Sequence, residues 1–359
     1  MAYCLDKYRN KRRKTPLQKL LLAALLLGIL AGMGIAGWLY SALFSPNVWV
    51  KGNGMDYVNI PTNSEFDDIK ILLYSKGLIE NRSSFEWLAR QKGLDKNVKP
   101  GRYKVRNGMS NLQFVRMLSS GLQEPVKLVF NNIRTRSQLA GRISQQIEAD
   151  SARIDSLLND PGFLSRYGLS PNTSVSLFIP NTYEFWWNTS AEQFIEKMAQ
   201  EHDKFWSDER KNKARTLGMS IPQVSTLASI IEQETNKNDE KARMAGVYIN
   251  RMNLRWPLQA DPTLKFALGD FSLRRILSIH KEIDSPYNTY KYPGLPPGPI
   301  CIPSISSIDA VLNAEKNQYL FFCAREDMSG YHVFTASHEQ HMQNAARYQR
   351  ALNNLKIYK

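Results

Sequence analysis

The feature that most limits how this chain can fold is an uncharged apolar stretch near its N-terminus. Residues 20–44 contain no charged side chain, and the next charge is Lys51. As a helix rising 1.5 Å per residue, this stretch is about 37 Å long, enough to cross a hydrocarbon core of about 30 Å. A secretory signal peptide has a shorter apolar region. A buried core helix would not need to be apolar on every side. We therefore expect a transmembrane helix over residues 20–44, with Trp38 and Tyr40 at the far interface.

Positive charge is concentrated before this stretch. Residues 1–19 carry seven Lys and Arg against the single acid Asp6, so this arm holds +6 of the formal net charge of +14. By the positive-inside rule the basic arm is cytoplasmic, and the remaining chain lies beyond the membrane. The sequence predicts a single-pass protein of the cytoplasmic (inner) membrane with periplasmic or extracytoplasmic domains. A nucleic-acid partner is not expected, because the basic arm adjoins a membrane helix.

The part beyond the membrane divides into two regions of different pattern. Residues 46–123 alternate short helical and strand signals, which predicts a small α+β module suited to binding or spacing. Residues 124–359 begin with a strand signal at 126–130 and continue with amphipathic helices and long polar loops, which predicts a larger mixed α/β domain. The predicted fold class is therefore α+β, with one transmembrane helix, a small α+β module and a larger mixed α/β domain.

One helix of the larger domain carries the strongest chemical signal. Ser220, Pro222 and Gln223 form a helix start with a capping box. At about 100° per residue, Glu234 lies close to the apolar face of the following helix, whereas Glu232 lies roughly 110° away. A carboxylate beside apolar walls has a raised pKa and is suited to act as a general acid. We expect Glu234 to face the protein and Glu232 to be a solvated charge at the helix end.

Glu234 alone is a weak signal, because it could simply pair with Arg243 or Arg251. The loops that follow make chemistry the better interpretation, since they are polar, aromatic and dense in Pro and Gly, and such elaborate loops are typical of binding sites. These loops cover residues 258–269, 285–303 and 332–337.

Several of these segments together resemble the YceG-like endolytic murein transglycosylases. The similar motifs are L-A-S-I-I-E-Q-E-T, V-Y-I-N-R-M, L-Q-A-D-P-T, S-P-Y-N-T-Y followed by G-L-P-P-G-P-I, and H-x-F-T. The resemblance implies a LysM-like module at 46–123 and a catalytic YceG-like domain at 124–359. It also implies a lyase that cuts within peptidoglycan strands at the MurNAc–GlcNAc β-1,4 bond and leaves 1,6-anhydroMurNAc ends, with Glu234 as the catalytic acid and Glu232 in reserve.

The same loops supply candidates for substrate binding. Intramolecular attack by the sugar's own hydroxyl needs only one residue that serves as acid and then as base, whereas a hydrolase needs a second carboxylate, for which Asp261 is the candidate. Asn181 and His338 depart from the pattern that we associate with the family. The candidate substrate-binding residues are Gln259, Asp261, Tyr287, Asn288, Tyr290 and His332.

Other features suggest less. The aromatic run Tyr183, Phe185, Trp186 and Trp187 could stack on sugars, although core packing is the more common role of such side chains. Cys301 and Cys323 could form a disulfide or remain thiols. The sequence S-H-E-Q-H at 337–341 lacks the spacing of H-E-x-x-H, so no metal is expected, and no cofactor is implied.

Two functional classes follow from these observations. The first is the membrane-anchored lytic transglycosylase, whose tether suits it to ending nascent glycan strands near the membrane. Its partners would be peptidoglycan strands, the membrane, and cell-wall synthases with division or elongation proteins. The alternative is a non-catalytic, membrane-anchored scaffold that binds peptidoglycan.

Overall fold

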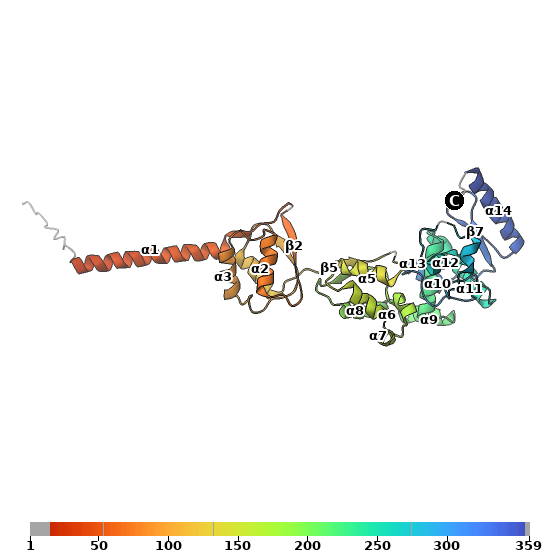
Figure 1. Cartoon of the computed structure of the whole chain (residues 1–359), viewed down its shortest axis with the longest axis horizontal. Helices are drawn as coiled ribbons and strands as arrows, with labels where there is room; N and C mark the ends of the chain where they lie inside the picture. Colours follow the sequence, from red (N-terminus) through yellow and green to blue (C-terminus); the bar gives the residue numbers. More distant parts are fainter. Residues whose placement is uncertain (1–14, 53, 132, 274, 356–359) are drawn as a thin grey trace, which may run out of the picture. The chain divides into compact units, whose positions relative to one another are not determined.

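The computed structural model describes residues 15–52, 54–131, 133–273 and 275–355. The chain forms two compact units, Met1–Glu124 and Pro125–Lys359 (Figure 1). Both units mix helices with two-stranded antiparallel sheets, as expected for an α+β protein. Most of the basic arm predicted over residues 1–19, including Cys4, lies outside the described residues.

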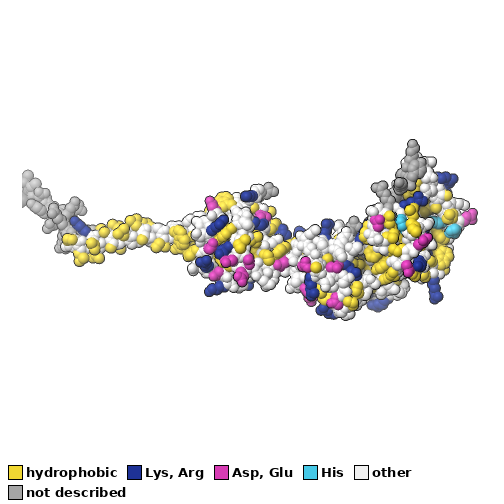
Figure 2. Space-filling view, viewed as in Figure 1, with side chains coloured by type: hydrophobic (Ala, Val, Ile, Leu, Met, Phe, Trp, Pro, Cys, Tyr) yellow, Lys and Arg dark blue, Asp and Glu magenta, His cyan; other side chains and the backbone are white. Residues whose placement is uncertain are grey.

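The first unit begins with the long apolar helix. Its elements are α1 (Pro16–Phe44), β1 (Pro46–Val48), β2 (Met55–Ile60), α2 (Phe66–Ser75), α3 (Arg82–Gln91), β3 (Gly101–Arg106), β4 (Met109–Ser110) and α4 (Asn111–Ser120). Helix α1 starts four residues earlier than predicted, because Thr15 caps it and Pro16 occupies its first position. Figure 2 shows apolar side chains along its length. In the part of the chain that the structure describes, α1 is the one helix long and apolar enough to cross a membrane.

The C-terminal end of α1 is fixed to the globular part of this unit. The ring of Trp38 meets Trp87 of α3 edge to face at 5.1 Å between centroids. Asn111, at the start of α4, is fully buried and donates to the carbonyl of Ala42 at 2.9 Å. Because both contacts use the last turns of α1, the apolar helix continues directly into the folded module.

The remaining elements of this unit enclose a small core. Strands β2 and β3 pair antiparallel from Met55 opposite Arg106 to Ile60 opposite Gly101. Helices α2, α3 and α4 place Leu73, Phe85 and Phe114 in the buried cluster. The alternation of short helices and strands predicted over residues 46–123 is confirmed, and Gly121 adopts the left-handed conformation that ends α4.

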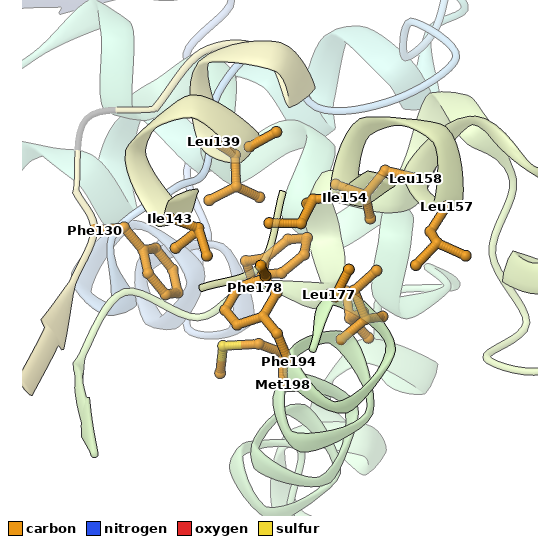
Figure 3. Close-up of a cluster of buried hydrophobic side chains, with 14 of the residues drawn as sticks. Phe130, Leu139, Ile143, Ile154, Leu157, Leu158, Leu177, Phe178, Phe194 and Met198 are labelled. Carbon is orange, nitrogen blue, oxygen red and sulfur yellow. The ribbon is translucent and has the colours of Figure 1, made fainter. Parts of the chain in front are cut away.

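The second unit is larger, and its first half surrounds a separate core (Figure 3). Side chains from α5, α6, α8 and the turn after the 3₁₀ segment meet there, including Leu139, Ile154 and Phe194. The elements of this half are β5 (Val126–Val129), α5 (Arg136–Ser144), α6 (Ser151–Asn159), α7 (Pro161–Ser165), the 3₁₀ segment η1 (Pro171–Leu177), β6 (Thr182–Phe185), α8 (Ala191–Phe205) and α9 (Asp208–Thr216).

The proposed aromatic platform of this half is not a continuous surface. Strand β6 alternates inward and outward, so Tyr183 and Phe185 are buried in the core, whereas Trp186 just after the strand is 51% exposed. Tyr183 also donates its hydroxyl to the Ile179 carbonyl at 2.7 Å. Core packing is therefore the role of Tyr183 and Phe185.

The second half of this unit positions the loops noted in the sequence. Its elements are α10 (Ile221–Glu234), α11 (Asn238–Asn253), α12 (Asp261–Leu268), the 3₁₀ segment η2 (Ser278–Glu282), α13 (Ile305–Leu312), β7 (Phe321–Ala324), β8 (His332–Thr335) and α14 (His338–Asn354). Helix α10 packs against α11, α12 and α13. Cys301 is buried and Cys323 lies in β7, and both are free thiols.

Candidate active site

The candidate site is built around the C-terminal end of α10. The predicted capping box is confirmed, since Ser220 accepts from the Gln223 amide and the Gln223 side chain accepts from the Ser220 amide. Every residue from Val224 to Ile231 is buried, which fixes the helix in the core. Glu234 is the last helical residue, because the backbone becomes extended at Thr235, and its side chain is half-buried.

Glu234 is held by a buried tyrosine of the next helix. The hydroxyl of Tyr248 donates to Oε1 of Glu234 at 2.9 Å, and Tyr248 is only 1% exposed. Burial raises the pKa of Glu234 to about 7, and the negative charge of Asp261 acts in the same direction, while the Tyr248 hydrogen bond and the charges of Lys265 and Arg251 oppose them. Near neutral pH this carboxyl group is therefore balanced between its acid and base forms.

The alternative in which Glu234 only pairs with an arginine is not supported. Arg243 pairs with Glu315 at 3.0 Å. Arg251 donates to the carbonyls of Leu320 at 2.7 Å and Leu258 at 2.6 Å, so it ties α11 to the adjoining loops. In the described part of the chain, neither guanidinium forms a hydrogen bond or an ion pair with Glu234.

Glu232 differs from the expectation of a solvated helix-end charge. Its Oε2 accepts from Lys241 at 3.1 Å and from the hydroxyls of Ser304 and Ser307. Partial burial raises its pKa, but the two serine hydrogen bonds and the Lys241 charge outweigh this and leave the pKa of Glu232 lowered. Glu232 thus stays ionised and joins α10 to α11 and α13, which makes it a poor acid in reserve.

Asp261 and Tyr290 meet close to the acid. Asp261 is the first residue of α12, and its Oδ1 accepts from the Tyr290 hydroxyl at 2.5 Å. Burial and the Asp261 hydrogen bond raise the pKa of Tyr290, so its hydroxyl stays protonated. The charge of Asp261 acts on Glu234, and the charges of Asp261 and Glu234 both act on Tyr290, so these three predicted residues lie at one site.

The other loop candidates occupy different environments. Asn288 is fully buried, and its amide donates to the Lys281 and Ile283 carbonyls, both at 2.8 Å, while its oxygen accepts from the Tyr290 amide at 3.0 Å. The polar atoms of Asn288 are thus already used to shape the loop, and its contact with substrate stays a prediction.

Tyr287 and Gln259 remain available to a ligand in different ways. Tyr287 is half-buried against Phe266 at 4.7 Å between ring centroids and lines a cavity of about 290 Å³. Gln259 is exposed in the left-handed conformation, with φ 52°, and its backbone amide donates to the Thr289 carbonyl at 2.9 Å. Its side chain is thus turned toward solvent beside the loop that carries Tyr290.

The imidazole and the backbone amide of His332 both contact the carboxylate of Glu240. Its Nδ1 lies 3.0 Å from Oε2 of the buried Glu240, whose other oxygen accepts from the His332 amide at 2.9 Å. The ring of His332 packs edge to face on Phe322, which packs on Tyr248 in the same way. His332 therefore supports the position of Tyr248 through the ring of Phe322.

Tyr248 was missed as a site residue by reasoning from the sequence. It lies 14 positions after Glu234, within the V-Y-I-N-R-M segment that carries part of the family resemblance. That segment was the available signal, because it contains Tyr248, whose hydroxyl can hydrogen-bond a carboxyl group and orient it. Among the described residues, no group of three or more His, Cys, Asp or Glu side chains is placed to hold a metal ion.

Two curated proteins are similar to this chain over most of its length. The chain is 29% identical over 313 residues to the endolytic murein transglycosylase of Bacillus subtilis, covering 81% of this chain and 84% of that protein. It is 27% identical over 357 residues to the protein of the same name from Streptococcus pneumoniae D39, covering 90% of this chain but only 63% of that longer protein.

A solved structure and a family match extend these similarities. The structure, of a yceG-like protein from Listeria monocytogenes, has 31% sequence identity and a TM-score of 0.56, covering 81% of this chain and 99% of that one. The YceG-like family matches residues 58–347. Because that match spans most of the sequence, the chain belongs to the YceG-like family.

Proposed function

We propose that this protein is an endolytic peptidoglycan lytic transglycosylase in which Glu234 is the catalytic acid and base. The observation that carries the proposal is the pKa of Glu234, raised to about 7 by burial while Tyr248 orients the carboxyl group. A residue that must first donate and then accept a proton works best when its pKa lies near the working pH. The curated relatives named endolytic murein transglycosylases support the same reaction.

The chemistry proceeds without water. Protonated Glu234 donates its proton to the glycosidic oxygen as the bond from C1 of MurNAc to that oxygen breaks, so GlcNAc leaves with a free 4-hydroxyl. The C6 hydroxyl of the same MurNAc then attacks C1 and gives its proton to the Glu234 carboxylate. The product carries a 1,6-anhydro bridge, and the enzyme regains its starting protonation state. Attack from within the same sugar explains why one carboxyl group is sufficient.

The surrounding residues have separate roles in this proposal. Asp261 raises the proton affinity of Glu234 and holds the Tyr290 hydroxyl, which can face the positive charge that develops at C1. Gln259 and Tyr287 are proposed to contact the sugars. Asn288 and His332 support the loop and the helix behind the site through their own hydrogen bonds.

The first unit gives the reaction its location. Helix α1 is proposed to cross the inner membrane once, with the basic arm in the cytoplasm and both folded units outside. Residues 46–123 are proposed to act as a LysM-like module that binds glycan, and residues 124–359 as the catalytic domain. A tethered enzyme reaches strands near the membrane, which suits it to ending nascent chains beside cell-wall synthases and division or elongation proteins.

Product analysis with the full-length protein in detergent tests this function. Peptidoglycan is incubated with the wild type, with Glu234→Gln and with the control Glu196→Gln, which removes an exposed carboxylate from α8 of the same unit. Mass spectrometry should detect new 1,6-anhydro ends with the wild type and the control, and none with Glu234→Gln.

Two other outcomes would change the assignment. New reducing ends would indicate a hydrolase and direct attention to Asp261 as the second carboxylate. Glycan binding without any new ends, in wild type and Glu234→Gln alike, would instead indicate the non-catalytic scaffold.

A further inference from the structure

A half-buried arginine lies beside the helix end that carries the acid. Arg134 follows β5 in the chain and lines three cavities of the second unit, of about 670, 290 and 50 Å³. Gln233, the residue directly before Glu234, lines two of these three cavities and accepts from Nη2 of Arg134 at 3.1 Å. Arg134 therefore lines all three cavities, two of which adjoin the end of α10.

The side chain of Arg134 is held in place without an ion pair to any described residue. Its guanidinium lies over the ring of Phe271 at 4.7 Å, which together with Gln233 sets its position. Within residues 133–273 and the other described ranges, no carboxylate forms an ion pair with it, whereas Arg153 and Arg243 of the same unit each pair with a glutamate. A held, partly desolvated guanidinium with free donors favours an anion that it can bind with two parallel hydrogen bonds.

The carboxylates that share these cavities are already occupied. Glu232, in the largest cavity, is bound by Lys241 and two serines. Asp155, in the second cavity, accepts from Ser137 and Asn159, both at 3.1 Å. Neither is therefore in need of Arg134, and its free donors are left for a ligand.

The cavity walls match a carbohydrate that carries an acid. The largest cavity is lined by the amides of Asn131, Gln233 and Asn236, which suit sugar hydroxyls and acetamido groups. The second cavity is bordered by Phe266 and Tyr287, whose rings can pack on apolar sugar faces. Its volume and that of the largest cavity lie near or within the range of ordinary ligand pockets.

We propose that Arg134 is a substrate-binding residue that recognises a carboxylate carried by the muramic acid unit. This inference rests on the proposed function and adds the part of the glycan that the site selects. Two carboxylates of peptidoglycan have the required chemistry. One is the lactyl carboxylate, which is free only when the stem peptide has been removed. The other belongs to the stem peptide itself.

Kinetics of full-length Arg134→Gln on two substrates test this proposal. The substrates are strands that retain their stem peptides and strands from which an amidase has removed them. Loss of a charge-assisted bidentate contact should raise KM for anhydro-end formation by about ten- to a hundredfold, while kcat changes by less than about threefold. Arg134→Lys keeps the positive charge but cannot form the two parallel hydrogen bonds of a guanidinium, so it should retain part of the affinity.

The control is Arg142→Gln, which removes an exposed arginine of α5 in the same unit and should leave KM unchanged. A raised KM only on peptide-bearing strands would identify a stem-peptide carboxylate as the group that Arg134 binds. A raised KM only on strands without stem peptides would identify the lactyl carboxylate. An unchanged KM on both substrates, in Arg134→Gln protein with wild-type thermal stability, would overturn the inference. Failure of the wild type to form any anhydro ends would instead refute the proposed function.

Discussion

Removing the Tyr248 hydroxyl should move the pH dependence of the reaction in a defined direction. This hydroxyl donates to Glu234 at 2.9 Å from a nearly fully buried ring and stabilises the ionised carboxylate. In Tyr248→Phe the ionised form of Glu234 loses more stabilisation than the protonated form does, so the pKa of Glu234 should rise. Because the proposed reaction begins with protonated Glu234, activity should persist to higher pH.

The size of this shift follows from hydrogen-bond energies. A hydrogen bond to a charged acceptor contributes about 1.5–3 kcal/mol and one to a neutral acceptor about 0.5–1.5 kcal/mol. The difference of about 1–1.5 kcal/mol corresponds to about one pKa unit. The pKa of Glu234, raised to about 7 in the wild type, should therefore approach about 8 in the variant.

The assay is the pH profile of kcat/KM for anhydro-end formation, because this ratio reports the free enzyme. We expect the basic limb to move up by about one pH unit. The plateau should fall as well, since the carboxyl group loses the contact that orients it. Tyr319→Phe is the matched control, because the Tyr319 hydroxyl has no hydrogen bond within the described ranges. A basic limb that stays in place or moves to lower pH would refute the assignment of Tyr248 and Glu234.

Four further predictions follow from the same contacts. Asp261→Asn removes a charge that raises the pKa of Glu234, so the basic limb of kcat/KM should move to lower pH, opposite to Tyr248→Phe. The stability that protonated Glu234 gives is complete below pH 4.5 and is lost as pH rises through about 7. In denaturant unfolding, the free energy of unfolding of Glu234→Gln should therefore rise relative to that of the wild type by up to about 3 kcal/mol between pH 4.5 and 8. A Cβ at Gly298 would lie 1.9 Å from the Asn172 carbonyl oxygen, so Gly298→Ala should lower the free energy of unfolding by about 1–3 kcal/mol. Burial raises the pKa of Cys301 to about 12, so its alkylation at pH 8 should be slow in the folded protein and fast after denaturation.

Helix α10 could be predicted because its signals are local. Ser220 and Gln223 are three residues apart, and the apolar face repeats with the helical period, so neighbouring residues alone fix where the helix starts and where Glu234 points. The same reasoning located the apolar helix and most short helices of the first unit. These elements depend little on distant parts of the chain.

Glu232 and Asn288 could not be predicted in this way. The serines that bind Glu232 are 72 and 75 positions away in the sequence, and no periodic pattern connects them with α10. Asn288 has the side chain of a plausible sugar ligand, but its amide closes its own loop. Residue type indicated the possible chemistry in both cases, and only the tertiary fold decided which groups were already bound.

Glu232 and Glu234 show how one helix end separates two carboxylates. They lie two positions apart, so they face different sides of α10. One side presents Lys241 and two serine hydroxyls, which leave the pKa of Glu232 lowered. The other side presents a buried tyrosine and the charge of Asp261, and burial leaves the pKa of Glu234 raised. An acid must hold a proton at neutral pH, and of these two neighbours only Glu234 can do so. The ionised Glu232 is instead suited to fixing the helix end that presents Glu234.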